Sequence, residues 1–188
     1  MPYVLLYVLI VLNSACAISN YSPPEAVSTP PTEKHDRVES LSFSYLGDSK
    51  DLVSDGRALP WESQSIKDLF EHQSRFSKVI IASTPPQNGM HVNVYQTDGP
   101  VSSWCRASTW SLGIIPCYAD GVLYTMHFDV LIHNTLKESY QYEISRKGVQ
   151  WVGLLPFFWI NFFTTQYKDA FSANAQQFVI DAKRDGYL

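Results

Sequence analysis

Two histidines and an aspartate carry the residue types that a metal site needs. His91, His127 and Asp129 alternate with apolar residues in segments that have the pattern of β-strands, so they are expected on one face of neighbouring strands. Imidazole and carboxylate groups are zinc ligands, which makes these three residues candidate metal ligands. A solvated polar sheet face explains the same alternation without a metal. We favour that interpretation and expect no metal and no cofactor.

Cys16 stands in a setting that favours a different chemistry. Residues 3–12 form an apolar run with the length of a signal-peptide h-region, and the run is too short to span a bilayer as a helix. Ser14 and Ala15 follow, and then Cys16. This order resembles the lipobox of bacterial lipoproteins, although Asn13 occupies the position where that motif usually has leucine.

The resemblance implies that residues 1–15 are a signal peptide and that Cys16 is lipidated. Acyl chains such as palmitate would then anchor the protein to a membrane. Ala17 follows the cysteine in place of the aspartate of inner-membrane lipoproteins, which implies a periplasm-facing place on the outer membrane of a Gram-negative bacterium. Two alternatives stay open: cleavage at an ordinary A-x-A site, which would release a soluble protein, and an uncleaved anchor.

Cys105 and Cys117 are the cysteines left over once Cys16 is lipidated. In an oxidising compartment such a pair tends to form a disulfide, and closing a short loop contributes on the order of 3 kcal/mol to stability. We therefore predict a disulfide between them. Two buried free thiols are the alternative, because a sequence does not show whether two Cβ atoms meet.

The composition excludes some classes of function. Of 188 residues, 45% are hydrophobic and 17% charged, and the net charge of -4 lacks the basic excess of a nucleic-acid binder. The sequence also has no glycine-rich phosphate loop, CxxC pair, HExxH motif or GxSxG motif. We therefore expect no nucleic-acid partner and no catalytic residue. A small periplasmic hydrolase or metal-binding enzyme is the alternative.

The chain divides into a tether and one folded domain. Residues 16–37 hold the lipidated cysteine and a stretch rich in Pro, Ser and Thr, which buries too little to offset the entropy of ordering. From residue 38 to residue 188 the hydrophobic pattern predicts a single α+β domain. It is a two-layer sandwich in which two helices pack on one face of a mostly antiparallel or mixed sheet. Its expected strands lie at residues 41–45, 79–82, 90–95, 124–132 and 140–144, and its expected helices at 63–76 and 166–183.

Three segments resemble a group of uncharacterised proteobacterial lipoproteins: residues 109–118, 142–156 and 170–188. The unit at residues 63–82 is loosely similar to the amino-terminal domain of TolB and of envelope lipoproteins built like it. That group has no assigned activity, so the resemblance carries no catalytic residue over to this chain. Relatives in the TolB-like group oligomerise, which implies a homo-oligomer, or a subunit of an envelope export assembly, as a further alternative.

Residues 151–163 are almost continuously apolar, and only Pro156 and Asn161 interrupt the run. The segment is too short for a membrane-spanning helix. It is interpreted as a buried connection, as a surface for a protein partner or as an interfacial membrane contact. We predict that part of it stays accessible and makes a contact outside its own domain. The candidate contact residues are Trp151, Phe157, Phe158, Trp159, Phe162 and Phe163.

These features together favour a lipid-anchored envelope protein that binds or scaffolds other envelope components. Its partners would be the membrane, through the N-terminal lipid, and envelope proteins that the sequence does not identify.

Overall fold

The computed structural model describes residues 17–22, 40–45, 60–74, 76, 78–82, 84–86, 89–100 and 102–188, without the side chains of Pro60 and Phe158. Cys16, the expected signal peptide and residues 23–37 of the expected tether lie outside the described residues. The described elements are, in chain order, β1 (Ala17–Ser22), β2 (Ser40–Tyr45), α2 (Pro60–Gln73), β3 (Lys78–Ile81), β4 (Met90–Asp98), α3 (Ser103–Trp110), β5 (Cys117–Ile132), β6 (Thr135–Gln150), the 3-10 helix η1 (Val152–Phe163) and α4 (Tyr167–Arg184).

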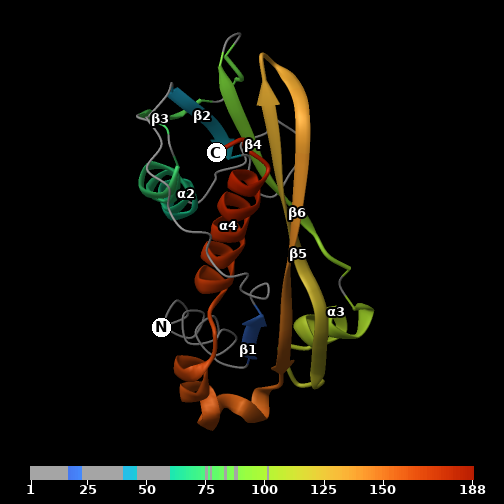
Figure 1. The fold of residues 1–188 in the computed structure, drawn as a ribbon. Coiled ribbons are helices and arrows are strands. Elements are labelled where there is room, and N and C mark those ends of the chain that lie inside the picture. Colours follow the sequence, from blue (N-terminus) through green and yellow to red (C-terminus); the bar gives the residue numbers. More distant parts are fainter. Residues whose placement is uncertain are drawn as a thin grey trace, which may run out of the picture.

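The strands form one mixed sheet in the order β1-β6-β5-β4-β2-β3. β2 runs parallel to β3 and β4, whereas β4, β5, β6 and β1 pair antiparallel. Helices α2 and α4 lie together on one side of the sheet, and α3 lies beside the lower part of the long β5–β6 hairpin (Figure 1). The predicted α+β sandwich is therefore confirmed, with α3 and η1 as additions to the two expected helices.

The core forms where alternate strand residues meet the two helices. Phe43 of β2 and Phe128 of β5 are fully buried. Phe70 of α2 packs edge-on against Phe43, with ring centroids 5.5 Å apart, and Phe178 of α4 stacks on Phe128 at 4.4 Å. Each large side chain removed from water in this way contributes roughly 1.5–3 kcal/mol. The period-two pattern of the strands and the apolar stripe of α4 thus meet in one layer.

The helix ends follow local rules that the sequence shows in part. α2 begins at Pro60, three residues before the expected start at residue 63. Proline is favoured in the first turn for two reasons. Its fixed φ suits a helix, and the backbone N–H that it lacks would have no hydrogen-bond partner within the helix at that position. α4 ends at Arg184, close to the expected end at residue 183, and Gly186 follows with a φ of 84°, a left-handed conformation that glycine adopts without strain.

The hairpin is longer and its turn tighter than expected. β5 and β6 have 16 residues each, and only His133 and Asn134 separate them. Both turn residues have positive φ, 51° and 58°, as a two-residue type I′ turn requires. Most residues between the expected strands at 124–132 and 140–144 therefore belong to β6, because this turn matches the twist of the flanking strands.

The N-terminal part of the expected tether is an edge strand of the sheet. Residues 17–22 form β1, which pairs antiparallel with β6 in a register that sets Ala17 opposite Gln150 and Ser22 opposite Ser145. The Tyr21 ring also packs against Tyr167 at the start of α4, with centroids 5.9 Å apart. The folded part of the chain therefore includes residues that we expected to lie in the tether and before the domain start at residue 38.

Candidate interaction surface

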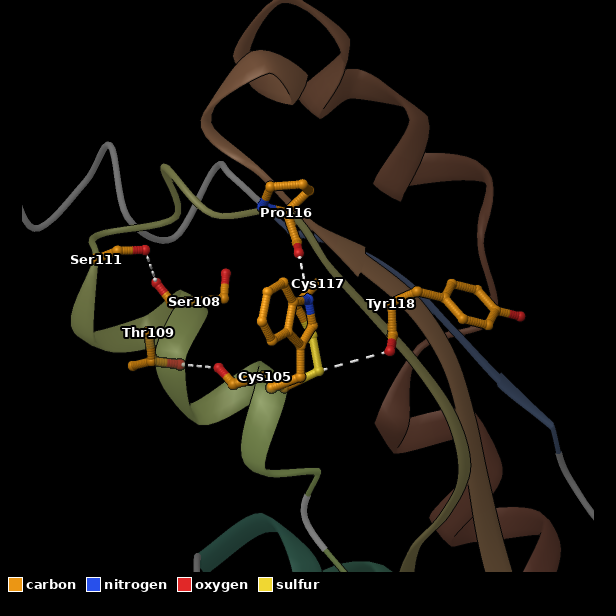
Figure 2. Close-up of a disulfide and its surroundings, with 8 residues drawn as sticks. Cys105, Ser108, Thr109, Ser111, Pro116, Cys117 and Tyr118 are labelled. Atoms are coloured by element: carbon orange, nitrogen blue, oxygen red, sulfur yellow. Dashed lines mark hydrogen bonds between the residues drawn. A yellow bond between two sulfur atoms is a disulfide. The ribbon is translucent and has the colours of Figure 1, made fainter.

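Helix α3 is joined to the start of β5 by the predicted disulfide. Cys105 lies in α3 and Cys117 is the first residue of β5, with their Cα atoms 5.1 Å apart (Figure 2). The Trp104 indole N–H donates a hydrogen bond to the Pro116 carbonyl at 2.9 Å, which adds a second link across the same loop. The disulfide therefore places a short helix, and the tryptophans at its two ends, beside the hairpin.

Helix η1 carries the aromatic segment and exposes most of it. It has no charged residue, and Pro156 stands inside it, where it has no N–H to donate to a regular α-helix. Phe162 is 74% exposed and Phe163 is 82% exposed. Trp151, Phe157 and Trp159 are exposed as well, whereas the side chain of Phe158 lies outside the described residues. The interpretation as a buried connection therefore does not hold for these side chains.

The loop after α3 contacts the start of η1 through a backbone hydrogen bond. The Val152 N–H donates to the Gly113 carbonyl at 2.8 Å, which ties the two segments together. Trp110 and Ile114 of the α3–β5 region are 84% and 68% exposed. We call the exposed apolar side chains of this region the aromatic end: Trp104, Trp110, Leu112, Ile114, Tyr118, Val149, Trp151, Val152, Phe157, Trp159, Phe162 and Phe163.

The aromatic end concentrates the exposed apolar surface of the described chain. All large hydrophobic side chains that are exposed there belong to it, except Ile80, Ile81 and Leu136. Large amounts of exposed apolar surface are uncommon on monomeric soluble proteins and mark sites of contact with proteins, ligands or membranes. The sequence indicated the part of this surface in residues 151–163 but missed its other members, Trp104, Trp110, Leu112, Ile114, Tyr118 and Val149.

Charged groups are almost absent from this part of the molecule. Residues 102–119 contain only Arg106, and residues 148–166 contain no charged side chain. The nearest ion pair along the hairpin joins Lys147 and Asp120 at 3.8 Å, and both side chains are exposed. The surface therefore changes over a short distance from apolar to charged.

Strand β1 is fastened to η1 by one asparagine. The Asn161 side-chain amide donates to the Ala17 carbonyl at 2.7 Å, and its oxygen accepts from the Ser19 N–H at 3.2 Å. Ala17 is also aligned with Gln150, one residue before Trp151. The chain therefore enters the described fold at the aromatic end, which is visible in Figure 1 as the lower end of β1 next to η1.

A cluster of hydrogen-bonded polar side chains on strands β2 and β4 includes the candidate metal ligand His91. Its Nδ1 lies 2.8 Å from the Ser42 hydroxyl, and its Nε2 lies 2.9 Å from Asn93 Oδ1. Ser44 donates to the same Asn93 oxygen at 2.8 Å. Burial lowers the pKa of His91 below its usual value, and the hydrogen bond with Asn93 opposes that shift.

Ser42, His91 and Asn93 are hydrogen-bonded in the order of a hydrolase triad, but their contacts hold neighbouring strands of the sheet together. Ser42 is buried in a strand, and its hydroxyl also lies 3.1 Å from the Met90 carbonyl oxygen as a hydrogen-bond donor. Buried polar groups need such partners, because an unpaired one costs about 1–3 kcal/mol. These contacts connect β2 to β4, so the geometry supports a structural role.

Other side chains engage the three candidate metal ligands, and Tyr95 contacts two of them, His127 and Asp129. The His127 ring stacks on Tyr95 with centroids 4.6 Å apart, and its Nε2 lies 3.0 Å from the Thr97 hydroxyl. Asp129 accepts a hydrogen bond from Ser139 at 2.6 Å. Among the described residues, no three His, Cys, Asp or Glu side chains come together in a way that would hold a metal ion.

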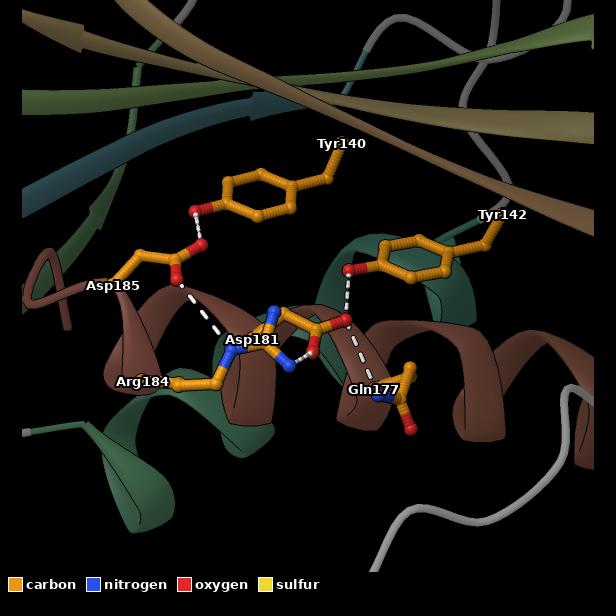
Figure 3. Close-up of polar contacts among 6 residues, drawn as sticks. All are labelled: Tyr140, Tyr142, Gln177, Asp181, Arg184 and Asp185. Atoms are coloured by element: carbon orange, nitrogen blue, oxygen red, sulfur yellow. Dashed lines mark hydrogen bonds and ion pairs between the residues drawn. The ribbon is translucent and has the colours of Figure 1, made fainter.

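Two tyrosines of β6 attach the sheet to the last turns of α4. Tyr142 donates to Asp181 at 2.7 Å and Tyr140 donates to Asp185 at 2.8 Å, while Arg184 pairs with Asp181 at 3.2 Å (Figure 3). Burial, followed by the hydrogen bond to the carboxylate, raises the pKa of Tyr142 and that of Tyr140 above the usual value. Both phenols stay protonated near neutral pH and act as hydrogen-bond donors.

The fold and surface together define an α+β sandwich domain with an exposed aromatic end. No known protein family matches this chain, and no curated protein does. Among solved structures, a variant of PelC from Paraburkholderia phytofirmans, determined as a dodecamer, aligns with 88% of this chain and 92% of its own at 9% identity and a TM-score of 0.32. A likeness of that degree carries no argument. Among the described helices, none is both long enough and apolar enough to cross a bilayer.

Proposed function

We propose that this protein is a lipid-anchored component of the cell envelope that acts by binding and not by catalysis. The observation that carries the proposal is the aromatic end, an exposed surface that lies where the chain enters the fold. Cys16 directly precedes Ala17, the first residue of β1. An acyl chain on Cys16 would therefore start beside the surface that is most suited to a contact.

The polar groups of the described residues support binding over catalysis. Ser42, His91 and Asn93 hydrogen-bond one another inside the sheet, and Asp181 and Asp185 hold tyrosines of β6. A catalytic site needs polar groups that converge on a substrate. Here the exposed surface that stands out is apolar, which suits the association of this domain with other envelope components.

Metabolic labelling in a Gram-negative host tests the anchor. Cells that express the full chain are fed an alkyne analogue of palmitate, and the protein is then separated into membrane and soluble fractions. We expect label on the wild-type protein, and we expect Cys16→Ser to lose both the label and the membrane fraction. The matched control is the double variant Cys105→Ser, Cys117→Ser, which retains Cys16 and should retain the label. A wild-type protein without label would contradict the proposal.

A further inference from the structure

Tryptophan is distributed very unevenly in this fold. Of the five tryptophans in the chain, Trp104, Trp110, Trp151 and Trp159 are exposed and belong to the aromatic end. The fifth, Trp61, is partly buried and packs edge-on against the core residue Phe171, with centroids 5.3 Å apart. Tryptophan is enriched where proteins meet the membrane–water interface, because its ring is apolar and its N–H is polar.

The charge around the aromatic end fits a lipid surface. Arg106, which is exposed and basic, lies on α3 between Trp104 and Trp110. At the border of the aromatic end the Tyr118 hydroxyl donates to Asp120, which pairs with Lys147. A basic group beside exposed tryptophan and phenylalanine matches the headgroup region of a bilayer that contains anionic lipid.

The N-terminal end of strand β1 lies at the same surface. Asn161 of η1 binds the backbone of Ala17 and Ser19, so the first described residue is held against the aromatic segment. A lipid attached at residue 16 would have at most a few ångströms of backbone between it and the aromatic end, since one extended residue spans about 3.3–3.6 Å. Two membrane-binding elements would then act on one bilayer patch, and stable anchoring generally needs two such elements.

We propose that the aromatic end inserts into the headgroup region of a phospholipid bilayer, with η1 and the α3–β5 loop as the inserted segments. The proposal rests on the lipid-anchored function above and adds the orientation of the domain. The charged pair Lys147–Asp120, which the Tyr118 hydroxyl contacts, would lie at the border of the inserted region among the lipid headgroups, and the hairpin turn at His133 and Asn134 would point away from the membrane.

Tryptophan fluorescence tests the insertion. The acylated protein, which begins at Cys16, is reconstituted into vesicles of phosphatidylethanolamine and phosphatidylglycerol, with or without dibrominated phosphatidylcholine, whose bromine atoms quench tryptophan at short range. Because four tryptophans belong to the aromatic end, we expect brominated lipid to remove about half of the emission or more. Iodide in the surrounding buffer should quench little. Trp61→Phe should leave the fraction quenched by brominated lipid unchanged or slightly larger, because Trp61 packs against the core.

The outcomes separate this inference from the proposed function. Membrane-bound protein that is quenched by iodide and not by brominated lipid would overturn the insertion, leave the anchor intact and favour a protein partner for the aromatic end. Protein that does not stay with membranes and carries no label would overturn the anchor itself. Replacing Trp110 and Trp159 with Phe should reduce the lipid-quenched fraction while the circular dichroism spectrum stays that of the wild type. An unchanged fraction would contradict the insertion of these two side chains.

Discussion

Polar side chains in this molecule connect elements that are distant in sequence. Asp181 of α4 accepts hydrogen bonds from Tyr142 of β6 and from Gln177, at 2.7 and 3.1 Å, and pairs with Arg184. Hydrogen bonds to charged groups contribute more than neutral ones, about 1.5–3 kcal/mol each. The end of α4 is therefore positioned by the hydrogen bonds and the ion pair of Asp181 as well as by the packing of Phe178 and its neighbours.

Replacing Tyr142 with Phe should lower the free energy of unfolding by about 1–2 kcal/mol, because Asp181 loses a donor and keeps its two other partners. Urea unfolding measures the change. The matched control is Tyr118→Phe, whose hydroxyl donates to Asp120 at 3.2 Å between exposed side chains, and it should stay within about 0.5 kcal/mol of the wild type. Equal losses in the two variants would contradict the role of the Tyr142 contact.

His91 should make the stability of the fold depend on pH. Burial holds its pKa below the usual 6.5, so the unfolded chain takes up a proton at a higher pH than the folded chain does. The free energy of unfolding should therefore fall as the pH drops below about 6.5. His91→Gln should remove this part of the slope in urea unfolding measured between about pH 7.5 and 5.5. Parallel curves for the two proteins would show that His91 does not titrate differently on folding.

At the scale of elements, the sequence predicted those whose pattern is local. Alternation located β2, β4 and the β5–β6 hairpin, and the apolar stripe with Gly186 located α4. β1 was missed because its partners are remote: the bond from Asn161 to Ala17 spans 144 residues. α3 was missed because Ser103–Trp110 is short and depends on the disulfide and on Trp104 for its position. η1 has no amphipathic period, so its exposure could not be derived from a pattern.

The disulfide should stabilise α3 and the aromatic end. Replacing both Cys105 and Cys117 with Ser should lower the free energy of unfolding by about 2–4 kcal/mol, because the cross-link restricts the unfolded chain. A reducing agent should destabilise the wild-type protein by a similar amount and leave the double variant unaffected. Mass spectrometry gives the direct check: if both thiols are alkylated without prior reduction, the bond is not present in the protein from the envelope.

Strand β1 should be part of the cooperative fold. A chain that begins at Val38 should melt several degrees below one that begins at Ala17, because it lacks six paired residues and leaves Asn161 without its backbone partners. This result would differ from the sequence-based expectation that residues 16–37 form a tether and that the domain begins at residue 38. Identical melting temperatures would show that β1 does not contribute to the stability of the fold.

The whole molecule has two ends of different character. One end carries the type I′ turn of the hairpin, and the other carries the aromatic end beside the start of β1 (Figure 1). Leu112 and Leu136 are both exposed leucines, at 54% and 56%, and they lie at these opposite ends. Contacts made from the two ends of the molecule can therefore be compared at these two positions, because their side chains are almost equally exposed.

Photocrosslinking from Leu112 in intact cells tests the central claim that the aromatic end is a contact surface and not part of the core. A photoreactive residue there should give a lipid or protein adduct, and one at Leu136 should give little. Adding Phe162→Ser and Phe163→Ser should reduce the Leu112 adduct several-fold with the melting temperature nearly unchanged, since exposed substitutions shift stability by only about 0.5 kcal/mol. The account is contradicted if the adduct persists, or if the two serines destabilise the fold by about 3–5 kcal/mol as a cavity in the core does.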